Sequence, residues 1–430
     1  MGGCFSQQDA ISGVPSQNGN GKDKIFYGRE GGREKENTEV PRVMLGGSCR
    51  YASMFTQQGM KGVNQDTMTI WEDSSEDKFQ IFCGVFDGHG PYGHKVARCV
   101  RDALPTKLCT VIKSTHGSHD SDSVMAKLES SDNSDIKSPE KSDPDQFIFS
   151  WENNLIKAFE DLDQDLKHQT GIDCICSGTT AVSVVKVREH LIVANLGDSR
   201  AVLCTRDGTN QLIPIQLSTD HKPDVQSETE RIISCNGRAF ALEEEPDIHR
   251  LWLPEDDSPG LAMSRAFGDF CLKEFGLIAT PEVSHRILSA KDEFLILASD
   301  GIWDVLSNEE AVKIASSTKN RSKAAKKLVK CAVKAWKHNH PASKIDDCAV
   351  ICIFLKELSS ANSSAISHGK SFAKSLSSAI LEEADKNNVL NEEYSALDGV
   401  SRANSILKLP RVLSSLSWRK RSFKLVEDDD

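Results

Sequence analysis

Residues 79–90 of this 430-residue chain read FQIFCGVFDGHG. The first eight form an apolar run of strand length, and the Asp and Gly residues that follow are typical of a strand end. Asp87 comes directly after the run and precedes Gly88-His89-Gly90. A strand end is a rigid mount for a side chain, and a neighbouring glycine lets a backbone carbonyl or solvent approach closely. The stretch therefore predicts a buried strand with a chemically active end.

Other segments predict a body of strands and helices. Further strand-like runs are 180–187 (TAVSVVKV), 191–196 (LIVANL), 294–298 (FLILA) and 349–355 (AVICIFL), and some are apolar throughout, as in strands buried on both faces. Apolar residues at helical spacing predict four helices. Their apolar positions are Val96, Val100, Leu104 and Leu108 in the first, Trp151, Leu155, Phe159, Leu162 and Leu166 in the second, and Leu328, Ala332 and Trp336 in the fourth; the third covers residues 309–316. Ser322 is a candidate cap for the fourth. Stacked sheets covered by helices would bury both kinds of element.

Polar segments suggest how the chain is divided. Residues 1–45 are rich in Gly, Gln, Asn and charge and predict a flexible tail. Residues 113–145 are rich in Ser and Asp and predict a solvated insertion, and residues 358–430 predict a Ser-rich C-terminal tail. What remains is one large domain over 46–357.

Charge and cysteine content exclude several classes of protein. The chain has 52 Lys and Arg against 63 Asp and Glu, a net charge of −11, so we expect no nucleic-acid partner. Its 13 cysteines are odd in number and scattered, which indicates thiols in a reducing compartment. No apolar run approaches the about 18 residues of a membrane span, and residues 1–25 lack the apolar core of a secretory signal. We therefore expect an intracellular protein that does not cross a membrane.

Carboxylates recur beside the apolar runs. Asp300 follows FLILAS, Asp346 and Asp347 precede AVICIFL, and Asp66 precedes TMTIW, as Asp87 follows FCGVF. Acids brought together in this way repel one another unless a cation neutralises them, and an all-oxygen site suits Mg²⁺ or Mn²⁺. Asp-Gly is also common turn chemistry. On spacing alone, a metal site and a set of turn residues both stay open.

Eight motifs occur in order: GVNQD (62–66), VFDGHG (85–90), SGTTA (177–181), ANLGDSRAV (194–202), DHKPD (220–224), LAMSRAFGD (261–269), LASDGIWDVL (297–306) and DDCAV (346–350). Together they resemble the metal-dependent protein serine/threonine phosphatases of type 2C, and most of all the plant members. The resemblance implies an α+β fold, a four-layer α/β/β/α sandwich of two mixed, largely antiparallel β-sheets flanked by helices.

The same resemblance implies a metal site with two Mg²⁺ or Mn²⁺ ions per subunit. The implied ligands are Asp66 (directly or through water), Asp87, the Gly88 carbonyl, Asp300 and Asp346. Asp87 would bridge the two ions. Asp347 stands where most members have Asn, and which of the adjacent pair is the ligand stays open. Asp198 and Asp304 match positions linked in some members to a weaker third metal.

The implied reaction is hydrolysis of phosphoserine and phosphothreonine by metal-activated water. His89 would protonate the leaving oxygen, because a serine alkoxide is a poor leaving group; the alternative is a histidine that braces the turn. Lys61 aligns with a phosphate-binding Arg and offers a point charge in place of a bidentate fork; the alternative is a surface lysine. Gln65 replaces an acid often found before Asp66. For Arg265 we expect a buried ion pair in preference to a phosphate contact.

The amino terminus fits the N-myristoylation pattern M-G-x-x-x-[ST], with Gly2 as the acyl acceptor and Ser6 in place. Cys4 is the candidate for a second acyl chain. We therefore expect a cytoplasmic monomer at the inner face of the plasma membrane, acting on phosphoproteins. The competing hypothesis is a catalytically weak, membrane-tethered scaffold that keeps the fold in order to bind phosphoproteins.

Overall fold

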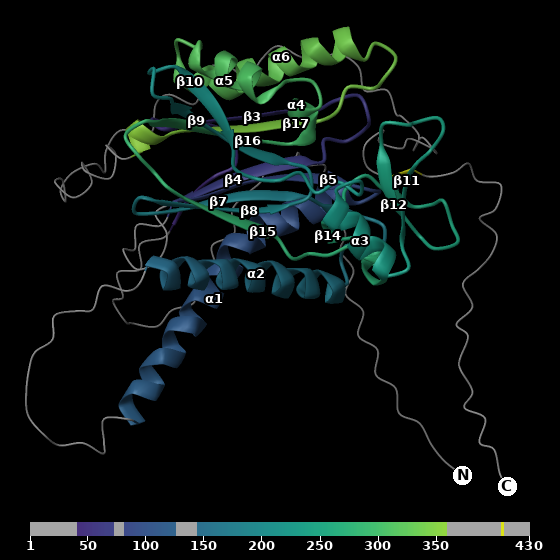
Figure 1. Cartoon of the computed structure of the whole chain (residues 1–430), viewed down its shortest axis with the longest axis horizontal. Coiled ribbons are helices and arrows are strands. Elements are labelled where there is room, and N and C mark those ends of the chain that lie inside the picture. The colour runs from purple at the N-terminus through teal and green to yellow at the C-terminus, as the bar shows by residue number, and fades with distance from the viewer. Residues whose placement is uncertain (1–40, 73–80, 126–143, 359–405, 408–430) are drawn as a thin grey trace, which may run out of the picture. The chain divides into compact units, whose positions relative to one another are not determined.

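Two β-sheets lie face to face, and helices cover both outer faces (Figure 1). The computed structural model describes residues 41–72, 81–125, 144–358 and 406–407. The helices α1 (Gly93–Met125) and α2 (Pro144–His168) lie on one side of the sandwich. The helices α4 (Asp300–Trp303), α5 (Asn308–Ser316) and α6 (Ala324–Asn339) lie on the other side. The α+β sandwich expected from the sequence is confirmed.

The first sheet has the central order β1-β4-β5-β7-β8-β15. Its strands are β1 (Arg42–Met44), β4 (Asp66–Glu72), β5 (Ile81–His89), β7 (Ala181–Val187), β8 (His190–Leu196) and β15 (Glu282–Ile287). Two short strands, β6 (Gly178–Thr179) and β14 (Phe267–Gly268), extend it beside the end of β5. β1 lies within residues 1–45, the expected N-terminal tail.

The second sheet has the order β10-β9-β16-β17-β3-β2. Its strands are β10 (Leu212–Gln216), β9 (Arg200–Arg206), β16 (Asp292–Ala298), β17 (Cys348–Phe354), β3 (Ala52–Gln57) and β2 (Gly47–Ser48). The strand ladders described in both sheets are antiparallel, so the parallel component that "mixed" implied is not seen among them.

A third, small sheet was not predicted. It contains β11 (Arg238–Ala241), β12 (His249–Trp252), β13 (Gly260–Leu261) and β18 (Ile406–Leu407), and α3 (Gln226–Ser234) packs near it. β18 comes from the expected Ser-rich tail and pairs with β13. The small sheet joins the sandwich through residues 262–266, which lead from β13 to β14.

Alternating side chains of the apolar strands fill two different layers. On β5, Phe82 and Phe86 pack with the apolar stripes of α1 and α2, while Cys83 and Val85 lie in the layer between the sheets. This alternation follows from the period of two residues in a strand and explains why β5 is apolar on both faces. A third layer lies between the second sheet and the helices α4 to α6.

The predicted helical stripes are buried, but two helix limits differ from expectation. Ser322 does not cap α6: its hydroxyl donates to the side chain of Asn320, which caps a separate 3₁₀ turn, and α6 begins at Ala324. α1 continues to Met125, so the polar segment expected as an insertion at 113–145 begins as helix. Residues 126–143 of that segment lie outside the described residues. No described helix is long and apolar enough to cross a membrane.

Candidate active site

The ends of both sheets bring carboxylates to one place. Asp66, at the start of β4, is the register partner of Asp87 in β5. Asp87 lies within the strand, which continues to His89, so the sequence expectation that the strand ends before Asp87 was wrong. The hydroxyl of Ser299, between β16 and α4, donates to Asp66 Oδ2 at 2.6 Å and accepts the backbone N–H of Ala349 at 3.0 Å. This serine, which the sequence reasoning missed, ties the acid-bearing ends of the two sheets together.

The resulting cluster carries strong mutual repulsion. Burial raises the pKa of Asp300 well above its usual value, and the charges of Asp87, Asp346, Asp304 and Asp198 raise it further. These acids are therefore close enough to act on one carboxyl group. Acids from both sheets therefore lie near Asp300, although among the described residues they do not already form a ligand set.

Two lysines balance part of this charge. Lys61 Nζ lies 2.6 Å from Asp346 Oδ2, and the two side chains are 1% and 2% exposed. Lys61 is thus not a surface lysine. Lys222 Nζ lies 3.0 Å from Asp198 Oδ2. Burial opposes the charge of Lys222, but Asp198 and the neighbouring acids outweigh it and raise the pKa of its ammonium group.

Asp346 and Asp347 face different partners. The carboxylate of Asp347 accepts the backbone N–H groups of Gly59 at 2.8 Å and Gln65 at 2.9 Å, so it anchors the loop that carries Lys61. Asp346 instead contacts Lys61 and raises the pKa of Asp300. Asp346 therefore contacts the Lys61 side chain, whereas Asp347 contacts the backbone of the loop that carries it.

His89 is held by an acid that the sequence reasoning did not single out. His89 Nε2 forms a short, buried contact with Asp269 Oδ2. The contact depends on Gly178, which pairs with His89 in one ladder and with Gly268 in the other. A Cβ at Gly178 would collide with the Asp269 carboxylate and lie 2.7 Å from His89 Nε2. Asp269 is the last residue of the quoted motif LAMSRAFGD, the one available signal.

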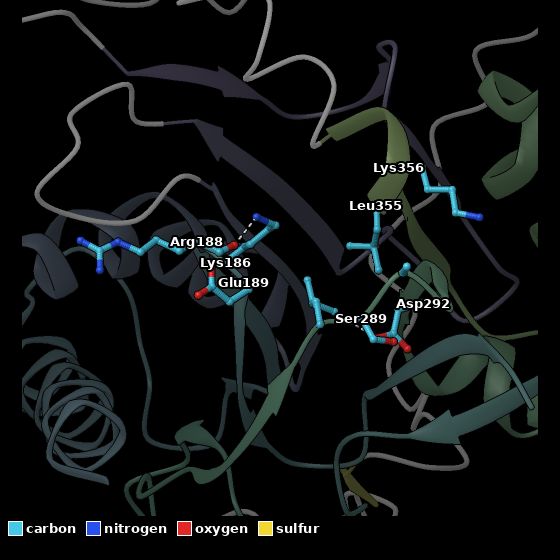
Figure 2. A pocket seen from close by; sticks show the side chains of 9 residues that line it. Lys186, Arg188, Glu189, Ser289, Asp292, Leu355 and Lys356 are labelled. Atoms are coloured by element: carbon cyan, nitrogen blue, oxygen red, sulfur yellow. Dashed lines mark hydrogen bonds between the residues drawn. The ribbon is translucent and has the colours of Figure 1, made fainter. Parts of the chain in front are cut away.

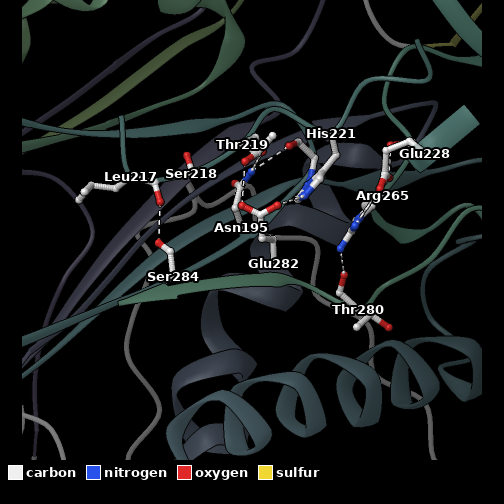
Figure 3. Close-up of polar contacts among 12 residues, drawn as sticks. Asn195, Leu217, Ser218, Thr219, His221, Glu228, Arg265, Thr280, Glu282 and Ser284 are labelled. Carbon is white, nitrogen blue, oxygen red and sulfur yellow. Dashed lines mark hydrogen bonds and ion pairs between the residues drawn. The ribbon is translucent and has the colours of Figure 1, made fainter. Parts of the chain in front are cut away.

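Arg265 forms the ion pair that we expected. Its guanidinium donates to Glu228 Oε1 at 2.7 Å and to the Thr280 carbonyl at 3.1 Å (Figure 3). Burial opposes the charge of Glu228, but hydrogen bonds from Arg231, Arg265 and Ser264 outweigh it and lower the pKa of its carboxyl group. Arg265 therefore braces α3 against the segment that leads to Asp269.

A separate cavity lies at the other end of the strands. It has a volume of about 520 Å³ and is lined by Lys186, Arg188, Leu288 and neighbouring residues (Figure 2). Lys186 pairs with Ile81 at the start of β5, whereas the acid cluster forms around Asp87 near its end. The cavity shares no residue with the acid cluster.

The donors of the acid cluster suit hard cations. Asp198 Oδ1 and Asp300 Oδ1 are buried, and neither atom has a hydrogen-bond partner among the described residues. Oxygen donors of this kind are the ligands that Mg²⁺ and Mn²⁺ prefer. No three His, Cys, Asp or Glu side chains in the described ranges already converge as a ligand set. The donor atoms suit a divalent cation, and binding it would require carboxylates such as Asp346 to break their ion pairs with the lysines.

Comparison with known proteins identifies the family. Residues 50–340 match the family model described as protein phosphatase 2C. The chain belongs to the protein phosphatase 2C family. It is a protein serine/threonine phosphatase, a metal-dependent phosphomonoesterase, and family membership implies dependence on Mg²⁺ or Mn²⁺.

Plant proteins are among its relatives. "Probable protein phosphatase 2C 73" of Oryza sativa subsp. japonica is 53% identical over 388 residues, covering 88% of this chain and 91% of that protein. "Probable protein phosphatase 2C 33" of Arabidopsis thaliana is 43% identical, covering 88% and 90%. The serine-threonine phosphatase 2C of Toxoplasma gondii has the same fold, with a TM-score of 0.61 at 23% identity, covering 73% of this chain and 99% of that one. The predicted family and its plant character are confirmed.

Proposed function

We propose that this phosphatase hydrolyses phosphoserine and phosphothreonine at the acid cluster around Asp300. The ligands of two Mg²⁺ or Mn²⁺ ions per subunit would be Asp66, Asp87, the Gly88 carbonyl, Asp300 and Asp346. The observation that carries the proposal is the Ser299 link: Asp66 pairs with Asp87 in one sheet and is hydrogen-bonded to the residue before Asp300 in the other. This link supports a cation site shared by the acids of both sheets.

The cations, when bound, supply a water of lowered pKa and neutralise charge on the phosphoryl oxygens. The chain supplies positioning. Lys61 is already buried beside the cluster, and its loop is pinned by Asp347. With Asp346 bound to a cation, the Lys61 ammonium would be available to bind a phosphate oxygen as a point charge.

His89 is the proposed proton donor. Its Nε2 is engaged by Asp269, while its Nδ1 is buried without a hydrogen-bond partner among the described residues. Asp269 therefore orients the ring and leaves Nδ1 as the nitrogen that gives its proton to the departing serine or threonine oxygen. The Asp269 carboxylate holds the ring at its other nitrogen throughout.

Metal depletion tests the proposal. We expect exhaustive treatment with EDTA to abolish phosphate release from a phosphothreonine peptide, and added Mn²⁺ or Mg²⁺ to restore it, because the repelling acids need cations. Circular dichroism spectra recorded in parallel show whether the chain stays folded. Full activity after exhaustive chelation would contradict the two-metal proposal. Absence of activity at every metal concentration would favour the scaffold hypothesis.

We further propose that lipid chains tether this phosphatase to the cytoplasmic face of the plasma membrane, where it acts as a monomer on phosphoproteins. Gly2 and Cys4 lie outside the described residues, so support comes from the pattern M-G-x-x-x-[ST]. One myristoyl chain binds membranes only marginally. Residues 1–40 carry five Lys and Arg against six Asp and Glu, so no basic patch assists it. A second chain on Cys4 meets this need.

Membrane fractionation of the full chain in plant cells tests the tether. We expect Gly2→Ala to move the protein to the supernatant, and Cys4→Ser to leave weak, reversible association, because one chain is lost instead of both. Gly3→Ala, the same type of change one residue away, is the matched control and should stay with the membrane. Pelleting of the Gly2→Ala protein with membranes would rule out this anchor.

A further inference from the structure

Two cysteines lie side by side next to the segment that holds His89. Cys176 Sγ and Cys271 Sγ are 3.4 Å apart, although 95 positions separate them in the chain. Backbone hydrogen bonds keep their segments together: the N–H of Cys271 donates to the Ile175 carbonyl at 3.0 Å, and that of Asp269 donates to the Ser177 carbonyl at 3.1 Å. The closeness of the sulfurs is therefore built into the backbone pairing.

The pair is also accessible. Cys176 and Cys271 are half-buried, whereas Cys83, Cys204, Cys348 and Cys352 are buried. The cysteines of the described residues form no disulfide. A small oxidant can therefore reach this pair while the buried thiols stay protected.

We propose that hydrogen peroxide converts Cys176 and Cys271 into a reversible disulfide that slows the phosphatase. The effect on turnover rests on the proposed roles of His89 and Asp269, while formation of the bond does not. Disulfides of cytosolic proteins are typically transient and redox-sensing. The structure thus contains a modification site next to the proposed proton donor.

The oxidation takes two steps, and either cysteine of the pair can begin it. The thiolate of one cysteine attacks the peroxide: its sulfur bonds to one peroxide oxygen, the O–O bond breaks, and the other oxygen leaves as water after taking a proton. The second cysteine loses its proton and attacks the sulfenic sulfur; the S–S bond forms, the S–O bond breaks, and a second water leaves. Two thiols are oxidised and one peroxide is reduced.

Backbone contacts connect the disulfide to His89. Cys271 is two residues after Asp269, and Cys176 precedes Ser177, whose carbonyl accepts the N–H of Asp269. A disulfide bond is about 2.05 Å long, so the sulfurs must approach each other. Both Asp269 and His89 pack tightly against Gly178, where even an added Cβ would collide. The movement therefore displaces the Asp269–His89 contact, and a displacement of about 1 Å at a catalytic group lowers turnover on the order of 10²-fold.

Peptide mapping of the full chain tests bond formation. Trypsin releases Cys176 in peptide 168–186 and Cys271 in peptide 266–273. After peroxide, we expect these peptides to be linked in the wild type and not in Cys176→Ser or Cys271→Ser. Fragment ions separate Cys176 from Cys174 on the same peptide. Dithiothreitol should remove the link.

Activity and the His89 ring test the coupling. We expect peroxide to lower kcat/KM at least about tenfold in the wild type and in the matched control Cys235→Ser, reversibly, and to spare both pair variants. The His89 imidazole resonance, identified by its loss in His89→Gln, should shift on oxidation even if the reduced protein shows no hydrolysis. The proposal would be overturned if peroxide produced no linked peptide. It would also be overturned if the link formed but neither shifted that resonance nor lowered the activity, or if the pair variants were inhibited as strongly as the wild type.

Discussion

Asp300→Asn is expected to lower kcat/KM for a phosphothreonine peptide about 10³-fold or more, because it removes a charge on which the cluster depends. Raising Mn²⁺ should not restore the activity. The measurement is steady-state hydrolysis at matched free Mn²⁺, with thermal unfolding to confirm the fold. The substitution relieves repulsion from Asp87, Asp346, Asp304 and Asp198, so the folded apoprotein should be at least as stable as the wild type.

Asp347→Asn is the matched control for that experiment. It makes the same chemical change next to a proposed ligand, but its side chain binds the backbone of Gly59 and Gln65. We expect a loss of only a few fold, because one of two hydrogen bonds to the loop remains. If Asp347→Asn were as damaging as Asp300→Asn, or if Asp300→Asn were nearly fully active, the assignment of the ligands would be wrong.

His89→Ala is expected to slow turnover of a phosphoserine peptide on the order of 10²-fold or more. Hydrolysis of nitrophenyl phosphate should fall much less, because nitrophenolate leaves readily without a proton. Comparing kcat for the two substrates at saturating Mn²⁺ separates the two roles of the ring. Loss of a proton donor should mainly slow the substrate with the poor leaving group, the phosphoserine peptide.

A bracing role for His89 gives a different pattern. Its contact with Asp269 lies next to Gly88, so a purely structural histidine would disturb the metal site on removal. Both substrates would then slow equally, and the apparent affinity for Mn²⁺ would fall as well. Equal losses with weakened Mn²⁺ affinity would assign His89 to the structural role.

Local patterns in the sequence predict the helical stripes and the most apolar strands of the sandwich, but not strands such as β3, β9, β10 and β15. The apolar runs correspond to β5, β7, β8, β16 and β17. They are recognisable because a strand buried on both faces is apolar along its whole length. The stripe on α2 is likewise local, since residues three and four apart share one face. The small sheet escaped prediction because its strands are two to four residues long and one of them comes from the distant segment 406–407.

The site was only partly predictable. Asp66, Asp87, Asp300 and Asp346 stand beside apolar runs, a signal readable from sequence. The partners of the site residues are remote in the chain: Ser299 binds Asp66 across 233 positions, and Asp269 contacts His89 across 180. No spacing rule relates such pairs, because the fold alone brings them together.

The adjacent acids at 346 and 347 show the same limit. The two acids have different partners, Lys61 for Asp346 and the loop backbone for Asp347, but the sequence alone leaves open which acid has which partner. The loop hydrogen bonds of Asp347 support our proposal that Asp346 is the ligand. Ser322 is a similar case, because Asn320 caps a 3₁₀ turn in the same loop and α6 begins at Ala324 without a side-chain cap.

Anomalous X-ray scattering at the manganese edge, from crystals of the phosphatase grown with Mn²⁺, tests the central claim most directly. The account predicts two strong peaks bounded by Asp66, Asp87, the Gly88 carbonyl, Asp300 and Asp346, with Asp346 turned away from Lys61. Crystals with no peak there and the 2.6 Å contact between Lys61 and Asp346 intact would contradict it.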